Sequence, residues 1–269
     1  MKNIFFYSSP RNRHTLLLHY KKIGTEFNEI DTKHTNNWEI SEILRSFLAI
    51  GWNIELVDRT CTNWKPSRHY AAGPAVDISD KLVDERYENF RLRHGVLKDT
   101  KHLRTFRTNI NEIMSYVAEI ICIDDNGFSA GTYSRFGKRI HTLRPSSSPN
   151  SFDGRLERFQ KNRNGFMLFL GNGFIAKGAD VVIDAFKDFP SAHLYVCGPY
   201  KEDKFFWNFY KKKMRNMSNI FLNGFVKVGS KQYFDLVSHS AWQLNNSAAE
   251  GSATSVTTLI QSGILPISN

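Results

Sequence analysis

GFMLFLGNGFIAKGADVVIDAF, residues 165–186, contains the clearest structural signal in this chain. It opens with a short apolar run bounded by glycines, which predicts a buried β-strand over 165–171. Gly-Asn-Gly follows, and from the next glycine, Gly178, the spacing of the apolar residues becomes helical over 178–186. A strand, a glycine turn and a helix in this order predict one unit of a parallel α/β sheet.

The same alternation of strands and helices extends in both directions. Parallel sheets are therefore expected, and the predicted fold class is α/β with two Rossmann-like domains that face a cleft. The linker PSSSPNS, 145–151, divides a short N-terminal domain, 1–150, from a C-terminal domain, 151–269. Further strands are predicted at 3–7, 53–58, 119–123, 139–143, 192–198, 219–225, 241–246 and 264–268, helices at 37–50, 83–94, 100–118, 201–214, 231–240 and 252–262, and a loop over 60–76.

Composition bounds the possible environments of the protein. The chain has 269 residues, 41% of them hydrophobic, and no segment approaches the roughly 18 apolar residues that a membrane span needs. Cys122 and Cys197 lie inside apolar runs and Cys61 is far from both, which predicts buried free thiols in a reducing cytoplasm. The formal net charge of +10 favours anionic ligands or surfaces, without distinguishing nucleic acid, lipid headgroups and phosphorylated small molecules.

The glycine turn after residue 170 is the first candidate site. Gly171 and Gly173 allow backbone amides to approach a phosphate, and Asn172 lies between them. Lys177, directly before the predicted helix, adds a positive charge. The spacing matches neither the dinucleotide fingerprint nor the Walker loop. An ordinary strand–helix turn with glycines for tightness remains the alternative.

A lone carboxylate marks the second candidate site. Glu250 precedes Gly251 and Ser252, where a predicted helix begins with free amides. In one interpretation the amides hold a diphosphate or a sugar oxygen, and Glu250 bonds sugar hydroxyls. In the other, Ser252 caps the helix and Glu250 compensates its dipole.

Taken in order, four landmarks extend these two sites into a family pattern: GNGFIAKG, HLYVCGP, NIFLNGFV, and NSAAEGSATSV with GILPIS. Over residues 165–269 this resembles the nucleotide-sugar domain of GT-B glycosyltransferases of the "group 1" retaining type. The resemblance implies that Lys177 and the glycine turn bind the donor diphosphate and that Glu250 binds the donor sugar. It also implies that Gly251 and Ser252 offer backbone amides to the donor.

The chain departs from that family at defined positions. Asn172 stands where the family usually has an arginine, and Thr258 stands where a second acid commonly contacts the ribose. In the short N-terminal domain, His69 is the one candidate for the catalytic histidine that relatives often carry. His34, Asn36 and Glu39 would lie at the cleft and touch acceptor or donor; alternatively, Asn36 and Glu39 cap the helix at 37–50 and His34 is a solvated loop residue.

The function that the resemblance implies is transfer of a sugar from a nucleotide-sugar donor to a glycan or lipid-linked acceptor, in cell-surface polysaccharide synthesis and with retention of configuration. The family continues beyond a strand such as ILPIS, whereas this chain stops at Asn269. The alternative is therefore an inactive, truncated fragment that binds a nucleotide or a partner protein. Asp124 and Asp125 have the composition of a turn, and no metal or other cofactor is expected.

Basic residues interleaved with aromatic ones suggest a further partner. The segments 86–107 and 211–215 are usually solvated helix faces, but with Phe90, Phe206 and Trp207 nearby they could dock on an anionic membrane. Peripheral association with the inner membrane face is thus an alternative to a purely cytoplasmic location. No recognised nucleic-acid-binding module is present, and no nucleic acid partner is expected.

Overall fold

The computed structural model describes residues 68–71, 73–96, 109–124, 127–145, 147, 164–250 and 253–268. Of the first 67 residues it describes the backbone of two strands, Asn3–Tyr7 and Asn53–Val57. All structural statements below concern these residues.

A five-stranded parallel sheet organises the C-terminal half. Its spatial order is β10-β9-β6-β7-β8, and every neighbouring pair is parallel. The predicted α/β class is confirmed here, because each strand continues to the next through a crossover that carries a helix. The strands are β6 Gly165–Phe169, β7 His193–Cys197, β8 Ile220–Gly224, β9 Ser240–Asn245 and β10 Leu265–Ser268.

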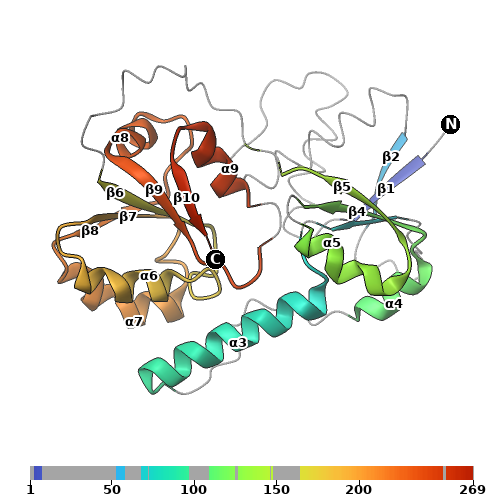
Figure 1. Cartoon of the computed structure of the whole chain (residues 1–269), viewed down its shortest axis with the longest axis horizontal. Coiled ribbons are helices and arrows are strands. Elements are labelled where there is room, and N and C mark those ends of the chain that lie inside the picture. Colours follow the sequence, from blue (N-terminus) through green and yellow to red (C-terminus); the bar gives the residue numbers. More distant parts are fainter. Residues whose placement is uncertain are drawn as a thin grey trace.

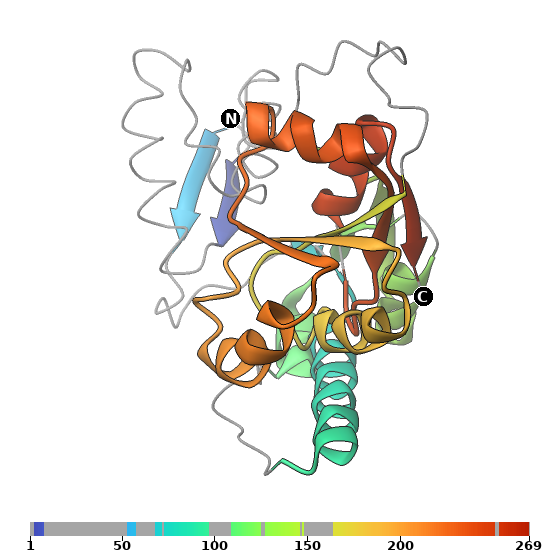
Figure 2. The ribbon, with the colours of Figure 1, turned by 90° about the vertical axis from the view of Figure 1, so that its left-hand side faces the viewer.

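Helices cover both faces of this sheet (Figures 1 and 2). Successive residues of a strand point to opposite faces, so Leu168 joins the core beside α6 and α7 whereas Met167 joins the core beside α8 and α9. Burial on both faces explains why the central strand β6, GFMLF, is continuously apolar. The helices are α6 Ala179–Ala185, α7 Lys204–Arg215, α8 Lys231–His239 and α9 Thr254–Gln261, and the 3-10 turn Phe186–Asp188 extends α6.

The N-terminal half also contains parallel strands. One pair is formed by β1 Asn3–Tyr7 and β2 Asn53–Val57, and a separate three-stranded sheet has the order β3-β4-β5. A smaller buried cluster, which includes Ala71, Met114 and Ile120, packs this second sheet against its helices. Its elements are β3 Arg68–Ala71, β4 Glu119–Ile123, β5 Arg139–Leu143, α4 Ile110–Tyr116, α5 Phe128–Tyr133 and the 3-10 turn Ser134–Phe136.

The predicted loop over 60–76 is wrong in part. Residues 68–71 form β3, in parallel register with β4, and a helix begins at Val76. A strand of four residues with no apolar alternation gives little local signal, and pairing with β4 stabilises it instead. The predicted helix at 37–50 lies outside the described residues, as does most of the linker at 145–151, so the domain boundary stays a prediction.

Helix α3, Val76–His94, connects the two halves (Figure 1). Near its start, the Ala75 N–H donates to Thr132 Oγ1 at 2.8 Å, and Arg135 forms an ion pair with Asp77 in the N-terminal half. Further along, three residues on one helical stripe enter the core of the C-terminal half: Val83, Tyr87 and Phe90. The apolar stripe at the described start of the basic segment 86–107 is therefore an interior contact, while Arg91 and Arg93 on the same helix remain partly exposed.

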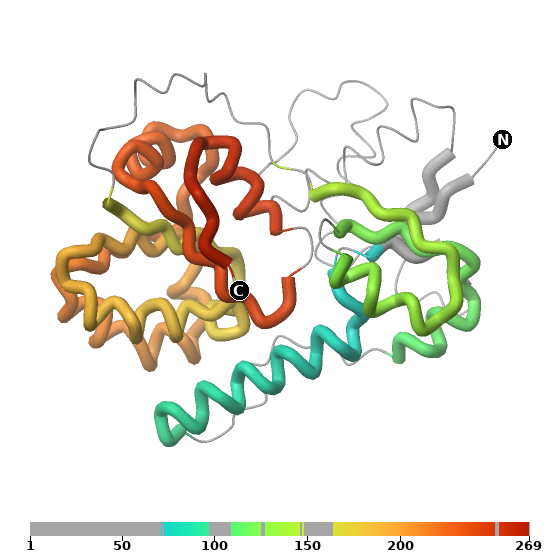
Figure 3. The backbone as a smooth tube through the Cα atoms, in the orientation of Figure 1, coloured from blue at the N-terminus to red at the C-terminus, as the bar shows by residue number. Residues whose placement is uncertain are grey.

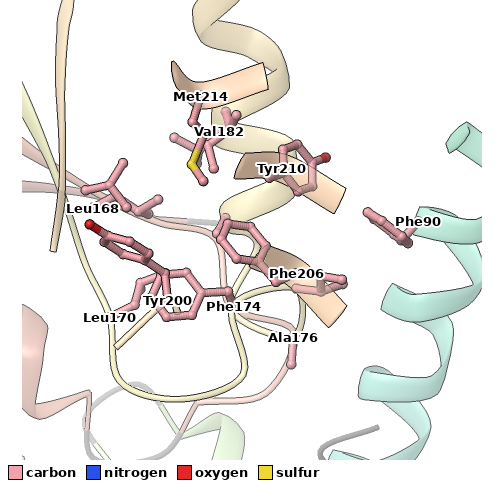
Figure 4. Close-up of a cluster of buried hydrophobic side chains, with 14 of the residues drawn as sticks. Phe90, Leu168, Leu170, Phe174, Ala176, Val182, Tyr200, Phe206, Tyr210 and Met214 are labelled. Carbon is pink, nitrogen blue, oxygen red and sulfur yellow. The ribbon is translucent and has the colours of Figure 1, made fainter. Parts of the chain in front are cut away.

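Phe90 lies at the centre of this contact and is 1% exposed (Figure 4). Its ring packs against Phe209 at 5.1 Å and Phe205 at 5.8 Å between centroids, with edge-to-face geometry. Phe206, also considered for membrane docking, is fully buried. Neither Phe90 nor Phe206 is available to insert into a membrane in this arrangement.

A polar network surrounds the aromatic contact. Arg93 is paired with Asp180 and, at 3.1 Å, with Asp184, while Lys213 is also paired with Asp184. Burial raises the pKa of Asp180, although the Arg93 charge opposes that shift. Burial and then the negative charge of Asp184 raise the pKa of Tyr210, so this hydroxyl stays protonated and can donate to Asp184 at 3.1 Å.

Candidate donor-binding site

Strand order brings the two sequence motifs together. Strand β6 lies between β7 and β9 and runs parallel to both. The segments that leave the carboxyl ends of β6 and β9 therefore meet at one edge of the sheet, the usual place for a ligand in a parallel α/β fold. The first segment carries Lys177 and the second carries Glu250.

The segment after β6 is a tight, mostly buried turn. Gly171 and Asn172 are exposed, whereas residues 174–178 are buried. Gly173 has φ 84°, a left-handed conformation that glycine adopts without strain. Asp203 holds the turn from outside, because its Oδ2 accepts the Phe174 N–H at 3.0 Å while its Oδ1 caps α7.

Several backbone amides of this turn already donate within the protein, at the end that leads into α6. The N–H groups of residues 177, 178 and 179 donate to the carbonyls of Gly173, Ile175 and Phe174, respectively. A phosphate at this turn would therefore meet the Lys177 ammonium and the segment 171–173 instead of the start of α6.

Gly178 explains how closely the two segments approach. It has φ 75°, and a Cβ placed on it would lie 2.2 Å from the Asn246 carbonyl oxygen. No other residue type fits beside that carbonyl without moving the backbone. The Ala248 N–H also donates to the Ala176 carbonyl at 2.8 Å. The segment after β9 is therefore fastened to the turn on both sides of Ser247.

Lys177 and Glu250 form an ion pair at the point where the segments meet. Lys177 Nζ lies 2.6 Å from Glu250 Oε2, and the two side chains are 10% and 28% exposed, respectively. The carboxylate neutralises an ammonium that has lost most of its water, which is how proteins hold a buried charge. Because both groups remain partly exposed, an anion that approaches Lys177 could compete with Glu250 for the ammonium protons.

The other predicted site residues differ in how far the structure describes them. Thr258 is fully buried on α9, and its hydroxyl oxygen has no hydrogen-bond partner among the described residues. Contact between that hydroxyl and a ribose would need α9 to move. His69 lies on β3 opposite Ile120, but the structure describes only its backbone. The remaining predicted residues lie outside the described residues: Gly251, Ser252, His34, Asn36 and Glu39.

Asp124 caps a helix. Its carboxylate accepts the N–H of Gly127 at 3.1 Å and the N–H of Ala130 at 2.7 Å, at the start of α5. These bonds satisfy a buried carboxylate with backbone donors, which agrees with the predicted turn. Asp125 lies outside the described residues.

Sequence reasoning missed three residues that shape this site: Arg86, Asp203 and Asn246. Asp203 has a local signal, since an Asp before an amphipathic run is a typical N-cap. Arg86 and Asn246 have none, because they are 160 positions apart and meet only in the folded chain.

No protein-family model and no curated protein sequence matches this chain. Among solved structures, sucrose-phosphate synthase from Thermosynechococcus elongatus aligns over 100% of this chain and 81% of its own, with a TM-score of 0.54 and 11% identity. Partial alignments are found with the pneumococcal O-GlcNAc transferase GtfA (TM-score 0.41, 18% identity, 57% of this chain and 30% of that one) and with TarM from S. aureus (0.46, 14%, 63% and 34%). This chain thus spans about a third of the length of the last two proteins.

Within the described residues, no helix is long and apolar enough to cross a membrane. The parallel sheets, the crossover helices and the alignment with the synthase agree on one architecture. The chain has the GT-B glycosyltransferase fold.

Proposed function

We propose that this protein is a glycosyltransferase that moves a sugar from a nucleotide-sugar donor to a glycan acceptor. One observation carries the proposal. In a GT-B fold, a nearly buried lysine and a glutamate form a 2.6 Å ion pair at the carboxyl ends of neighbouring parallel strands. An ammonium there can bind a diphosphate, and a carboxylate beside it can accept hydrogen bonds from sugar hydroxyls.

The pair suggests how donor binding would change the site. The donor diphosphate would take the Lys177 ammonium as its counter-ion, and Glu250 would then turn toward the sugar. Lys177 would stabilise the negative charge that develops on the leaving diphosphate as the glycosidic bond breaks. None of these steps needs a metal ion, so we expect the transferase activity to persist when a metal chelator is added.

The finer parts of the proposal concern the reaction and its surroundings. We propose retention of configuration, a cytoplasmic location and a role in cell-surface polysaccharide synthesis, all on the family resemblance of residues 165–269. A lipid-linked acceptor would bring the protein to an anionic membrane. Because Phe90 and Phe206 are buried, that contact would use four exposed residues of α7: Phe209, Lys211, Lys212 and Arg215.

Two variants test the site with opposite expectations. The protein is incubated with a panel of radiolabelled nucleotide sugars, and binding of the free nucleoside diphosphates is measured by calorimetry. Lys177→Ala should weaken diphosphate binding roughly 10- to 100-fold, the cost of a charge-assisted contact. Glu250→Gln should keep or tighten diphosphate binding, because the ammonium loses its competitor, yet should abolish transfer or hydrolysis of the sugar.

Matched controls are available on the same domain. Lys187 and Glu202 are both exposed, so Lys187→Ala and Glu202→Gln should leave binding and turnover unchanged. Equal diphosphate affinity of Lys177→Ala and wild type would refute the site. Diphosphate binding that depends on Lys177, without turnover of any sugar in the panel, would favour a nucleotide-binding module instead.

A further inference from the structure

A second feature near the site comes from the other half of the chain. Helix α3 starts among N-terminal residues and ends in the core of the C-terminal half, where Tyr87 and Phe90 are buried. Arg86 lies three positions after Val83 and four before Phe90, so it belongs to the same stripe of the helix. The tube in Figure 3 shows the segment after β9 descending toward α3.

Arg86 bonds the segment that carries Glu250. Its Nη2 donates to the Asn246 carbonyl oxygen at 2.8 Å and to Asn246 Oδ1 at 3.4 Å. The same carbonyl oxygen lies against Gly178, the residue after Lys177. A guanidinium bond to a carbonyl is charge-assisted and stronger than a neutral one. The Asn246 peptide is therefore held between α3 on one side and the lysine turn on the other.

Only short pieces of chain separate this anchor from the ion pair. Glu250 is four residues after Asn246, and the intervening Ala248 N–H is bonded to the Ala176 carbonyl at 2.8 Å. Ala176 is in turn the residue before Lys177. A shift of the Asn246 peptide would therefore move the backbone of both partners of the ion pair.

We infer that Arg86 is a positioning residue for the Lys177–Glu250 pair, through which α3 sets the geometry of the donor site. Arg86 acts through the backbone at Asn246, whose carbonyl oxygen accepts its hydrogen bond. The N-terminal half thus contributes to the donor site through a helix and not only through residues that face an acceptor. The expected effect of Arg86 on donor turnover rests on the proposed function, whereas its expected effect on the order of residues 246–250 does not.

The structural part is tested without any ligand. Hydrogen–deuterium exchange is compared for wild type, Arg86→Met, Arg86→Lys and Arg91→Met. Arg91 lies on the same helix and is paired with Glu88 of that helix, so Arg91→Met is the matched control. Arg86→Met should raise amide exchange in a peptide covering 246–250 several-fold and leave that of β7 unchanged, whereas Arg91→Met should change neither. Unchanged exchange at 246–250 in Arg86→Met would overturn the inference.

The catalytic part is tested by a split between kcat and KM. If Arg86 only supported folding, its loss would lower kcat in proportion to the folded fraction and leave the donor KM unchanged. A displaced ion pair should instead raise the donor KM roughly tenfold, with the acceptor KM unchanged, and Arg86→Lys should recover part of the loss. A fall in kcat alone would overturn the positioning role.

Failure of the inference and failure of the proposed function are distinguishable. If Lys177→Ala does not weaken diphosphate binding, the proposed function fails, and the exchange result still decides whether Arg86 orders the segment. If Lys177→Ala weakens binding as expected while Arg86→Met changes neither exchange nor donor KM, the function stands and the inference fails.

Discussion

Replacement of Arg93 by methionine should destabilise the protein in a pH-dependent way. Asp180 is 0% exposed and is paired with Arg93, whose own side chain is 37% exposed. Removal of one partner from a buried ion pair costs about 3–5 kcal/mol of unfolding free energy. Water reaches the exposed side of this pair, and Arg86 also lowers the pKa of Asp180, so we expect a smaller loss of about 2–3 kcal/mol near pH 7.5.

The sign of the pH dependence follows from Asp180. Burial raises the pKa of this carboxyl in the folded protein, so stability falls as pH rises through that value. Without Arg93 the pKa rises further, and the carboxyl becomes protonated at a higher pH. The deficit of Arg93→Met relative to wild type should therefore shrink on acidification to about pH 5.

Urea unfolding followed by circular dichroism at both pH values measures this deficit, together with hydrogen exchange of the α6 amides. In an Asp180→Asn background the same arginine replacement should cost less than about 1 kcal/mol, because no buried charge is left unpaired. Arg135→Met is the control, since the ion pair between Arg135 and Asp77 is 39% and 44% exposed and should contribute about 0–1 kcal/mol. An equal cost of Arg93→Met at both pH values and in both backgrounds would refute the reasoning.

Three further outcomes follow from the geometry around the site. Gly178→Ala should lower the free energy of unfolding by about 3 kcal/mol, and with it the melting temperature, because φ 75° and the Asn246 carbonyl both exclude a side chain. A melting temperature equal to that of wild type would contradict this. Asp203→Ala should cost about 1–2 kcal/mol, since two backbone amides lose their acceptor, and Asp203→Asn should recover part of it in the same melt. Burial raises the pKa of Cys122 to about 11 and that of Cys197 to about 12, so neither thiol of the native protein should react with iodoacetamide near pH 8, as peptide mass spectrometry would show.

Local sequence patterns predicted most of the C-terminal half. Every strand expected between 165 and 268 lies within one or two residues of its observed position, and each of the first four is followed by the expected helix. These elements were predictable because apolar runs, glycine turns and helical spacing are local properties. Strand β3 was not predictable in this way, because its four residues are stabilised by pairing with β4, which follows only after α3 and α4 in the chain.

The candidate site was predictable in its residues but not in its contacts. Gly171, Gly173 and Lys177 follow one strand and Glu250 follows another, and the sequence offers the first segment as a candidate phosphate site and the second as a candidate sugar site. The distance between them depends on the order of strands in the sheet. No local pattern specifies that β9 lies beside β6, and the ion pair joins residues 73 positions apart.

By itself, then, the sequence determined the α/β class, the parallel strands and the residue types of the candidate site. Tertiary structure alone decided that Lys177 and Glu250 meet and that Arg86, from the other half of the chain, holds the segment between them. It also decided that Phe90 of a basic segment is buried instead of exposed. The physical reason is that propensity and periodicity act over a few neighbouring residues, whereas strand order and helix docking depend on which apolar faces bury one another across the whole chain.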